Sequence, residues 1–324
     1  MKNYLVTGAA GFIASVVSRM LLDSGAAVVG IDNLNDAYDV RMKEHRLQHL
    51  ERYSNFQFIK QDISDRSIMK INELQGRDFD AVINLAARAG VRDSLLDPWV
   101  YMNTNSTGTL NLLEFCKEQK IQKFIQASTA GVYGDGAPLP TPETAPTNHP
   151  MQVYAASKLS AESLCYAYHS LYQIDVTVLR FFNVYGPSGR PDSAMFRFTK
   201  WIFENLEVRL NGDGTQTRGF TFVDDIARGT IAGLKRVGYE IFNLGGHEKI
   251  SINRLIEIIE DRTGNQARIV KYPRHPADIM SSLADVSKAK DMLKWNPSVS
   301  LEEGIARTVE WYQTNRDWAC EIET

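Results

Sequence analysis

Short apolar runs alternate with longer amphipathic stretches up to about residue 180. A strand that is buried on both faces, as in a parallel sheet, shows an almost continuous apolar run. Helices that cover both faces of such a sheet account for the amphipathic stretches, so the alternation predicts an α/β fold. The predicted strands are Tyr4–Thr7, Ala27–Ile31, Phe56–Lys60, Phe79–Leu85, Lys123–Ala127 and Val176–Phe182.

The segment 98–120 has the pattern of a helix with more than one apolar stripe. Leu110 and Leu113 share one stripe, while Leu112 and Phe115 lie on another. A helix that packs on one neighbour needs a single stripe, so we expect this one to bury a second face. A partner subunit is one candidate for covering that face.

The regular alternation stops near the middle of the chain. Two prolines and a glycine within 187–191 interrupt it, and the later elements are shorter and less evenly spaced. We therefore expect two domains, residues 1–183 and a smaller α/β domain over 184–324. The run Glu240–Leu244 again resembles a buried strand, so we expect about residues 220–247 to return to the first domain.

The composition is that of an ordinary globular protein. The chain has 324 residues, of which 44% are hydrophobic and 23% charged, enough apolar material for a large core. A formal net charge of −3 gives no overall attraction to nucleic acid or anionic lipid, so we expect neither as a partner. The three cysteines form no CxxC pair, and no adequate membrane span follows the uncharged stretch 3–18. We expect a cytoplasmic protein.

The first predicted strand leads into a loop that contains Gly8 and Gly11, and then into a helix. Such glycines let the backbone approach a pyrophosphate, and the free N–H groups and helix dipole complement its charge. Asp32 ends the second strand, where a carboxylate accepts a hydrogen bond from an adenosine ribose hydroxyl and repels a 2′-phosphate. This order favours an NAD site, with Asp62 and Ile63 after the third strand near the adenine. A tight turn and a capping Asp are the structural alternatives.

Tyr154 and Lys158 are four residues apart, so on a helix their side chains share a face. A nearby ammonium favours the phenolate, and the cationic nicotinamide ring of NAD⁺ would add to that effect. Tyr154 is therefore a candidate general base. Thr129 follows the predicted strand at Lys123–Ala127, where its hydroxyl could bridge Tyr154 and a substrate hydroxyl. The alternatives are an ordinary surface pair and a Ser/Thr turn that binds its own backbone.

Several further motifs occur in order along nearly the whole chain. They are TGAAGFI (7–13), GIDNLND (30–36), LAARAGVR (85–92), LRFFNVYGP (179–187), GRPD (189–192) and FTFVDDI (220–226). With the Tyr154/Lys158 pair, they resemble the extended short-chain dehydrogenases/reductases, specifically nucleotide-sugar epimerases similar to UDP-glucuronate 4-epimerases.

The resemblance implies a Rossmann-type doubly wound parallel sheet with a smaller α/β substrate-binding domain, and NAD as cofactor. It implies that Thr129, Tyr154 and Lys158 form the catalytic trio. The implied cofactor-binding residues are Gly8, Gly11, Phe12, Ile13, Asp32, Asn33, Asn35, Asp62, Ile63, Leu85, Ala86, Ala87, Arg88, Asn105, Tyr154, Lys158 and Phe181. The implied substrate-binding residues are Thr129, Asn183, Arg190, Arg218 and Asp278.

The implied reaction is NAD-dependent 4-epimerisation of a UDP-sugar through a transient 4-keto sugar. Related dehydratases carry an Asp-Glu pair after the threonine and decarboxylases commonly a glutamate, whereas this chain has Ala130-Gly131, which favours epimerisation. UDP-glucuronate 4-epimerases commonly place small hydroxyl residues there to meet the sugar carboxylate. Arg190 or Arg88 would have to compensate. UDP-glucose or UDP-N-acetylglucosamine 4-epimerase, UDP-glucuronate decarboxylase and a non-enzymatic NAD-binding regulator remain as alternatives.

Two further expectations concern assembly and metal. The resemblance implies a homodimer in which the helices over 98–120 and 152–173 of both subunits form a four-helix bundle. His45 and His49 have a spacing that can hold zinc, but no third ligand is in view. We expect a solvated helix there and no metal site.

Overall fold

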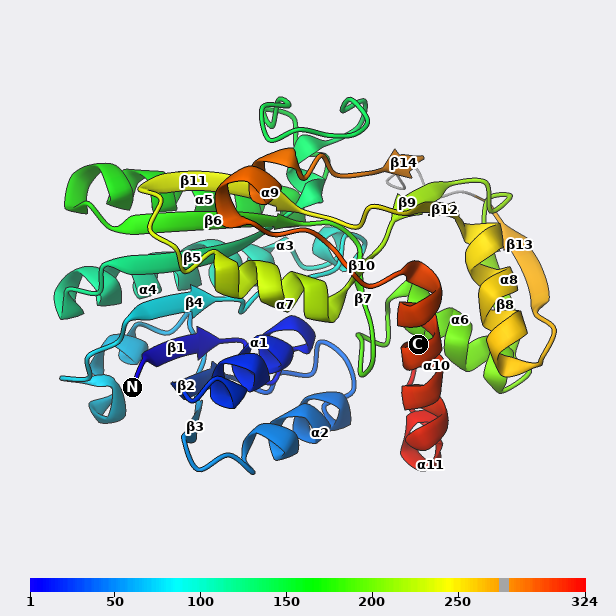
Figure 1. Ribbon diagram of the computed structural model, residues 1–324, viewed down its shortest axis with the longest axis horizontal. Helices are drawn as coiled ribbons and strands as arrows, with labels where there is room; N and C mark the ends of the chain where they lie inside the picture. Colours follow the sequence, from blue (N-terminus) through cyan, green and yellow to red (C-terminus); the bar gives the residue numbers. More distant parts are fainter. Residues whose placement is uncertain (274–279) are drawn as a thin grey trace.

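A computed structural model describes residues 1–273 and 280–324 of the chain. Its main sheet has seven parallel strands in the order β11-β6-β5-β4-β1-β2-β3 (Figure 1). The strands are β1 (Asn3–Thr7), β2 (Ala27–Asp32), β3 (Phe56–Lys60), β4 (Ala81–Asn84), β5 (Lys123–Thr129), β6 (Asp175–Phe181) and β11 (Tyr239–Leu244). From β1 the chain extends the sheet first through β2 and β3, and then on the other side through β4, β5 and β6. The Rossmann-type doubly wound sheet is therefore confirmed.

Each apolar run predicted as a strand forms one, with small differences in length. β4 is shorter than predicted because Phe79, although buried, lies in the turn that precedes the strand. β5 is longer than predicted and continues through Ser128 and Thr129, which pair with Arg180 and Phe181 of β6. Because Ser128 and Thr129 are polar, the apolar run that predicts the strand ends before them. The run near residue 240 forms β11, which pairs with β6 at the edge of the main sheet.

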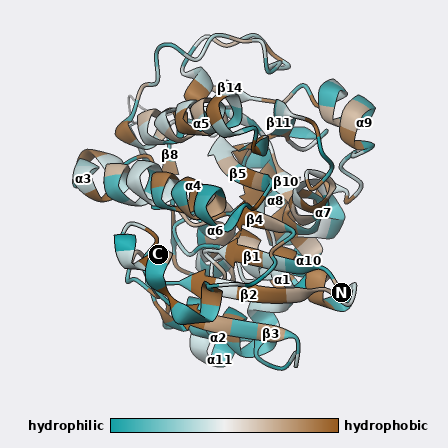
Figure 2. Ribbon diagram, turned by 90° about the vertical axis from the view of Figure 1, so that its left-hand side faces the viewer, coloured by the Kyte–Doolittle hydropathy of each residue, from teal (hydrophilic) through white to brown (hydrophobic). Residues whose placement is uncertain are grey.

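Helices cover both faces of the main sheet, as the near-continuous apolar strands require. One face packs against α4 (Gly108–Gln119) and α5 (Val153–Tyr172), and the other against α1 (Phe12–Asp23) and α7 (Val223–Ala232). Adjacent strand residues face opposite sides. In β1, for example, Leu5 joins the α4/α5 core and Val6 the α1/α7 core. In Figure 2 strand β4 is largely brown, between helices that carry much teal.

The predicted helix over 98–120 is present, but its middle turn differs from the rest. Helix α3 (Pro98–Tyr101) begins at Asp97, which caps the Val100 N–H, and continues through a π-helical turn over Met102–Thr107 into α4. Apolar periodicity does not reveal a π-helical turn, because such a turn changes the backbone hydrogen bonding but not which residues of the helix are apolar. Helix α5 matches the predicted range 152–173 closely. α3, the π-helical turn, α4 and α5 pack side by side.

The remaining elements form a second group with its own apolar core between α6, α8 and α10, at the right of Figure 1. Its strands are β7 (Val184–Tyr185), β8 (Glu207–Asn211), β9 (Thr217–Gly219), β10 (Thr221–Phe222), β12 (Lys249–Ser251), β13 (Arg268–Tyr272) and β14 (Ser281–Ser282). They pair as β10-β7, β12-β9-β14 and β13-β8. The helices are α6 (Ala194–Phe203), α8 (Ile252–Thr263), α9 (Ser287–Leu293), α10 (Leu301–Thr314) and α11 (Arg316–Ala319), and α2 (Arg41–Leu50) precedes β3. Unlike the others, α9 packs against α7 and β11 on the main sheet.

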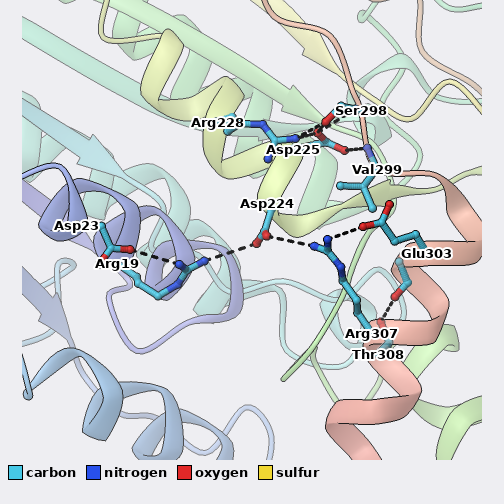
Figure 3. Close-up of polar contacts among 11 residues, drawn as sticks. Arg19, Asp23, Asp224, Asp225, Arg228, Ser298, Val299, Glu303, Arg307 and Thr308 are labelled. Atoms are coloured by element: carbon cyan, nitrogen blue, oxygen red, sulfur yellow. Dashed lines mark hydrogen bonds and ion pairs between the residues drawn. The ribbon is translucent and has the colours of Figure 1, made fainter.

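Two adjacent carboxylates at the start of α7 connect the two groups of elements (Figure 3). Asp224 lies 3.7 Å from Arg19 of α1 and 3.8 Å from Arg307 of α10. Asp225 is fully buried and accepts hydrogen bonds from the backbone N–H groups of Ser298 and Val299, at 3.0 and 3.1 Å. Asp225 therefore fixes the segment that leads into α10 against the start of α7.

None of the helices in the described residues has the length and apolar content that a membrane crossing requires. His45 and His49 do lie one turn apart on α2, but the prediction of a solvated helix is wrong for His45. Its ring packs against Trp311 and Trp318, with ring centres 5.9 and 5.0 Å away, and burial lowers its pKa to about 4. In the described part of the chain, His, Cys, Asp and Glu side chains form no group that could hold a metal ion.

Candidate active site

The loop between β1 and α1 is shaped for close approach of another group to its backbone. Gly8 has a φ of 70°, and a Cβ there would lie 2.8 Å from the backbone of Ala86 in the loop after β4. A Cβ on Gly11 would lie 2.8 Å from the carbonyl oxygen of Gly8. Gly11 is also the N-cap of α1 and has no capping side chain, so the first N–H groups of the helix are free to meet an anion. This loop fits a dinucleotide pyrophosphate.

A cavity of about 320 Å³ opens at the carboxyl ends of the strands, next to this loop. Most residues expected to bind the cofactor line it. They are Gly8, Gly11, Phe12, Ile13, Asp32, Asn33, Asn35, Asp62, Ile63, Leu85, Ala86, Ala87, Tyr154, Lys158 and Phe181. The local motifs therefore converge on one cavity, below called the first cavity, although they are up to 173 positions apart in the sequence (residues 8 to 181).

Arg88 and Asn105, two expected cofactor residues, are not among the residues that line the first cavity, although the Arg88 guanidinium donates to the lining residue Asn35 at 3.3 Å. Asn105, in the π-helical turn, accepts a hydrogen bond from the Arg88 N–H at 2.8 Å and donates to the Arg88 carbonyl at 3.0 Å. It also donates to the Ser157 hydroxyl at 2.9 Å. Asn105 thus holds the loop after β4 against α5, and its direct contact with a cofactor stays a prediction.

Asp32 lies at the end of β2, where its carboxylate could accept a hydrogen bond from a ribose hydroxyl. Its carboxylate accepts hydrogen bonds from the N–H groups of Ala10, at 3.2 Å, and Leu34, at 2.8 Å. Lys43 of α2 lies 3.9 Å from this carboxylate and also lines the first cavity. We did not predict Lys43. The available signal was a cation on the same helix stripe as the apolar residues Leu47 and Leu50.

Asp62 belongs to a polar group at the far end of the first cavity. Burial opposes ionisation of its carboxyl group, but hydrogen bonds from Ser64 and Asn33 outweigh this and hold its pKa below the usual range. The Asn33 amide donates to Asp62 at 2.7 Å and its carbonyl accepts from Asn35. These short polar side chains form the rim expected for ribose and adenine.

Tyr154 and Lys158 project from α5 into the first cavity, and Thr129 reaches it from the end of β5. Burial raises the pKa of Tyr154, against a hydrogen bond from the Thr129 hydroxyl and the charge of Arg190, which lower it. Burial lowers the pKa of Lys158 to about 8, and its ammonium donates to the Ala127 carbonyl at 3.0 Å. Arg190 is thus a cation that favours the phenolate. The spacing of residues along the helix did not indicate this effect.

The structural alternative for Thr129 is also realised. Its hydroxyl accepts a hydrogen bond from the Gly131 N–H at 3.1 Å, so it closes the turn after β5. The same hydroxyl can still donate to Tyr154, because accepting a bond leaves its single proton available. The turn therefore orients the hydroxyl toward Tyr154.

A second cavity of about 710 Å³ adjoins the first. The two share Tyr154, Asn183 and Arg190 in their linings, so these side chains lie where the cavities meet. Asn183 has a φ of 37°, a conformation that asparagine tolerates better than most residues. Arg190 is held by Asp192 through a hydrogen bond of 3.0 Å and an ion pair.

The second cavity is rich in arginine. Arg218 lines it as expected, whereas Asp278 lies outside the described residues. Further lining cations that we did not predict are Arg92, Arg197 and Arg209. They come from separate segments, and each by itself is typical of a solvated surface position. Together with Arg190 they give the cavity a positive charge that suits a diphosphate.

The sequence model of the NAD dependent epimerase/dehydratase family matches residues 4–245. The chain belongs to this family. The chain is 51% identical to a UDP-glucuronate 4-epimerase of Thermodesulfobacterium geofontis, over 97% of both chains. A crystal structure of UDP-glucuronic acid 4-epimerase from Bacillus cereus with UDP-glucuronic acid and NAD is similar, with TM-score 0.89, 39% identity, and 97% and 99% of the two chains covered. So is a UDP-glucose 4-epimerase from Thermotoga maritima with UDP-glucose, with TM-score 0.89, 34% identity and the same coverage.

Proposed function

We propose that this protein catalyses the NAD-dependent 4-epimerisation of UDP-glucuronate to UDP-galacturonate. The observation that carries the proposal is the position of Tyr154, which lines both cavities. A general base at that junction reaches a sugar hydroxyl on one side and a cofactor on the other. The similarity to UDP-glucuronate 4-epimerases over nearly the whole chain supports the choice of substrate.

We assign cofactor binding to residues 1–183 and binding of the UDP-sugar mainly to residues 184–324. The loop at Gly8 and Gly11 would hold the pyrophosphate of NAD, and Asp32 a ribose hydroxyl. NAD, when bound, supplies the acceptor and donor of the hydride. Lys158, fixed by the Ala127 carbonyl, lies in the same cavity as Tyr154.

Tyr154 would take the proton from the sugar 4-hydroxyl, with the Thr129 hydroxyl as a bridge between the two. Arg190 favours the ionised phenol, because its charge lowers the Tyr154 pKa. Once C4 is a planar ketone, the hexose has to present its other face before Tyr154 returns the proton. The arginines of the second cavity would therefore hold the diphosphate tightly while the sugar is held loosely.

The decisive test is to incubate the purified protein separately with UDP-glucuronate, UDP-glucose and UDP-N-acetylglucosamine, and to follow the configuration at C4 by NMR. We expect conversion of UDP-glucuronate to UDP-galacturonate with NAD bound and no net change in cofactor redox state. A pentose product would show decarboxylation instead. Absence of conversion of all three sugars would contradict the proposal.

UDP-glucose is a second candidate substrate, and Ala130-Gly131 is the observation that favours it. This dipeptide follows Thr129 and offers a methyl group and a hydrogen atom, which cannot donate to a sugar carboxylate. A uronate would instead need the charge of Arg190 or of Arg88. Comparison of kcat/KM for the two sugars separates these candidates.

We further propose a cytoplasmic homodimer. The helical layer of α3, α4 and α5 exposes large apolar side chains, including Trp99 at 77% and Leu171 at 69%, and Leu96, just before α3, is 85% exposed. An apolar surface of this kind is typical of an interface with a second copy. Cys116, Cys165 and Cys320 are all free thiols, as suits a reducing compartment.

A further inference from the structure

Glu162 is a buried carboxylate beside the first cavity that does not line it. It follows Tyr154 and Lys158 at the same spacing of four, so all three lie along one face of α5. Its side chain and that of Arg180 are 4% and 3% exposed. Buried charges of this kind cost solvation energy, and an apolar pair of the same volume is often as stable. We therefore expect the Glu162–Arg180 pair to have a role other than stabilising the fold.

The carboxylate of Glu162 joins α5, which carries it, to β5 and β6 beside the first cavity. One oxygen accepts hydrogen bonds from the Ser128 hydroxyl and from Arg180 Nε, the latter at 3.0 Å. The other oxygen accepts from Arg180 Nη2 at 2.7 Å. Ser128 and Arg180 are directly opposite each other on β5 and β6. The next pair along these strands is Thr129 and Phe181, and both line the first cavity.

We propose that Glu162 is a positioning residue for the reaction, which sets the Thr129 hydroxyl and the Lys158 ammonium in place relative to Tyr154. It does so from one helix, by binding the next-to-last residues of two neighbouring strands. Arg180 completes the arrangement, because its guanidinium also stacks on Tyr133 at 4.8 Å from the ring centre. This inference rests on the proposed function for its kinetic readout.

The charge of Glu162 also acts on Lys158. Burial lowers the pKa of Lys158, while the charge of Glu162 raises it. The Ala127 carbonyl from β5 accepts a hydrogen bond from this ammonium, and Glu162 and Cys165 face it from α5. Arg180 from β6 pairs with Glu162. Cys116 from α4 faces Cys165, and burial raises the pKa of both thiols well above the usual range, so neither supplies a charge. Glu162 is thus the anion that keeps this buried lysine protonated.

The test uses the full-length Glu162→Gln variant with NAD. We expect kcat for UDP-glucuronate to fall about tenfold while KM changes less than about twofold, because Glu162 touches neither ligand. We expect the alkaline loss of kcat to begin about one pH unit lower, since Lys158 loses its proton more easily. An unchanged kcat and pH profile would overturn the inference.

A matched control is Asp175→Asn. Asp175 forms an ion pair with Lys123 between β5 and β6 that is also largely buried, but at the opposite ends of the same strands. This variant should lower thermal stability and leave the pH profile unchanged. If Glu162→Gln folds poorly, the pair Glu162→Leu with Arg180→Met replaces both charges by apolar groups of similar size. A folded pair variant with the wild-type pH profile would contradict a positioning role.

A second readout does not depend on turnover. The near-ultraviolet absorbance of tyrosinate, taken as the difference between each protein and its Tyr154→Phe counterpart, reports ionisation of Tyr154 in the protein alone. We expect this ionisation at higher pH in Glu162→Gln than in the wild type. If the wild type epimerises no sugar but the shift is present, the proposed function fails and the positioning role stands. If the wild type epimerises sugars and no shift occurs, the positioning role fails.

Discussion

Lys158 shows how a single residue can be favourable for chemistry and unfavourable for the fold. It is charged below pH 8 yet only 2% exposed, and burial lowers its pKa from 10.5 to about 8. The unfolded chain therefore binds the lysine proton more strongly than the folded chain does. Below pH 8 the folded protein carries the full cost of the buried charge, and between about pH 8 and 10.5 that cost is progressively relieved.

We predict that Lys158→Met abolishes epimerisation and raises the free energy of unfolding by a few kcal/mol at pH 7. The gain should shrink as the pH rises through the range between the two pKa values, because the wild-type lysine becomes neutral there. Denaturant titrations of both proteins at several pH values measure this difference. A gain that does not depend on pH would show that the lysine charge is not the cause.

Single residues also differ in how far the sequence indicates them. Gly8, Asp32, Tyr154 and Lys158, which the structure brings to one cavity, could be proposed because each belongs to a local spacing whose chemistry can be stated without a fold. Lys43 was not predicted, because a cation on an apolar helix stripe can be related to Asp32 only once the fold brings α2 next to the end of β2. The effect of Arg190 on Tyr154 was missed for the same reason.

At the scale of elements, strands were predicted well because burial on both faces leaves an apolar run. The extension of β5 to Thr129 could not be read in this way, since Ser128 is a polar residue buried through its hydrogen bond to Glu162. The π-helical turn at Met102–Thr107 was equally hidden. It brings Asn105 into contact with the loop after β4, a long-range contact that local periodicity does not encode.

The start of α7 provides a stability prediction at this scale. Asp225→Ala removes the buried acceptor of the Ser298 and Val299 N–H groups and with it the attachment of this segment to α7 (Figure 3). We expect a loss of about 3 kcal/mol in the free energy of unfolding, measured by denaturant titration. The adjacent Asp224→Ala breaks only partly exposed ion pairs and should cost less than about 1 kcal/mol. Equal losses would contradict this account of α7.

At the scale of the whole molecule, the second cavity could not be derived from local patterns. Its arginines come from the loop after β4, the segment before α6, α6 itself, β8 and β9. These residues come together only when the chain folds, so the sequence indicated only Arg190 and Arg218, through the family resemblance. The main sheet, by contrast, follows from the order of its strands along the chain.

The proposed homodimer yields a prediction for the assembly. Trp99→Asp places a charge among the exposed apolar side chains of α3, α4 and α5, and we expect it to shift the protein from dimer to monomer in light-scattering measurements. The control is Ile269→Asp on β13, a residue that is also exposed but lies in the other group of elements. A wild-type monomer, or an unaffected dimer in Trp99→Asp, would refute this interface.

The central claim is that the phenol of Tyr154 moves the proton of the sugar 4-hydroxyl. Its most direct test is the Tyr154→Phe variant, assayed by NMR for conversion of UDP-glucuronate to its C4 epimer, with binding of NAD and UDP-glucuronate measured in parallel by calorimetry. We predict that conversion falls by a factor of about 10³ while both ligands still bind. Conversion at the wild-type rate by the folded variant would contradict the account.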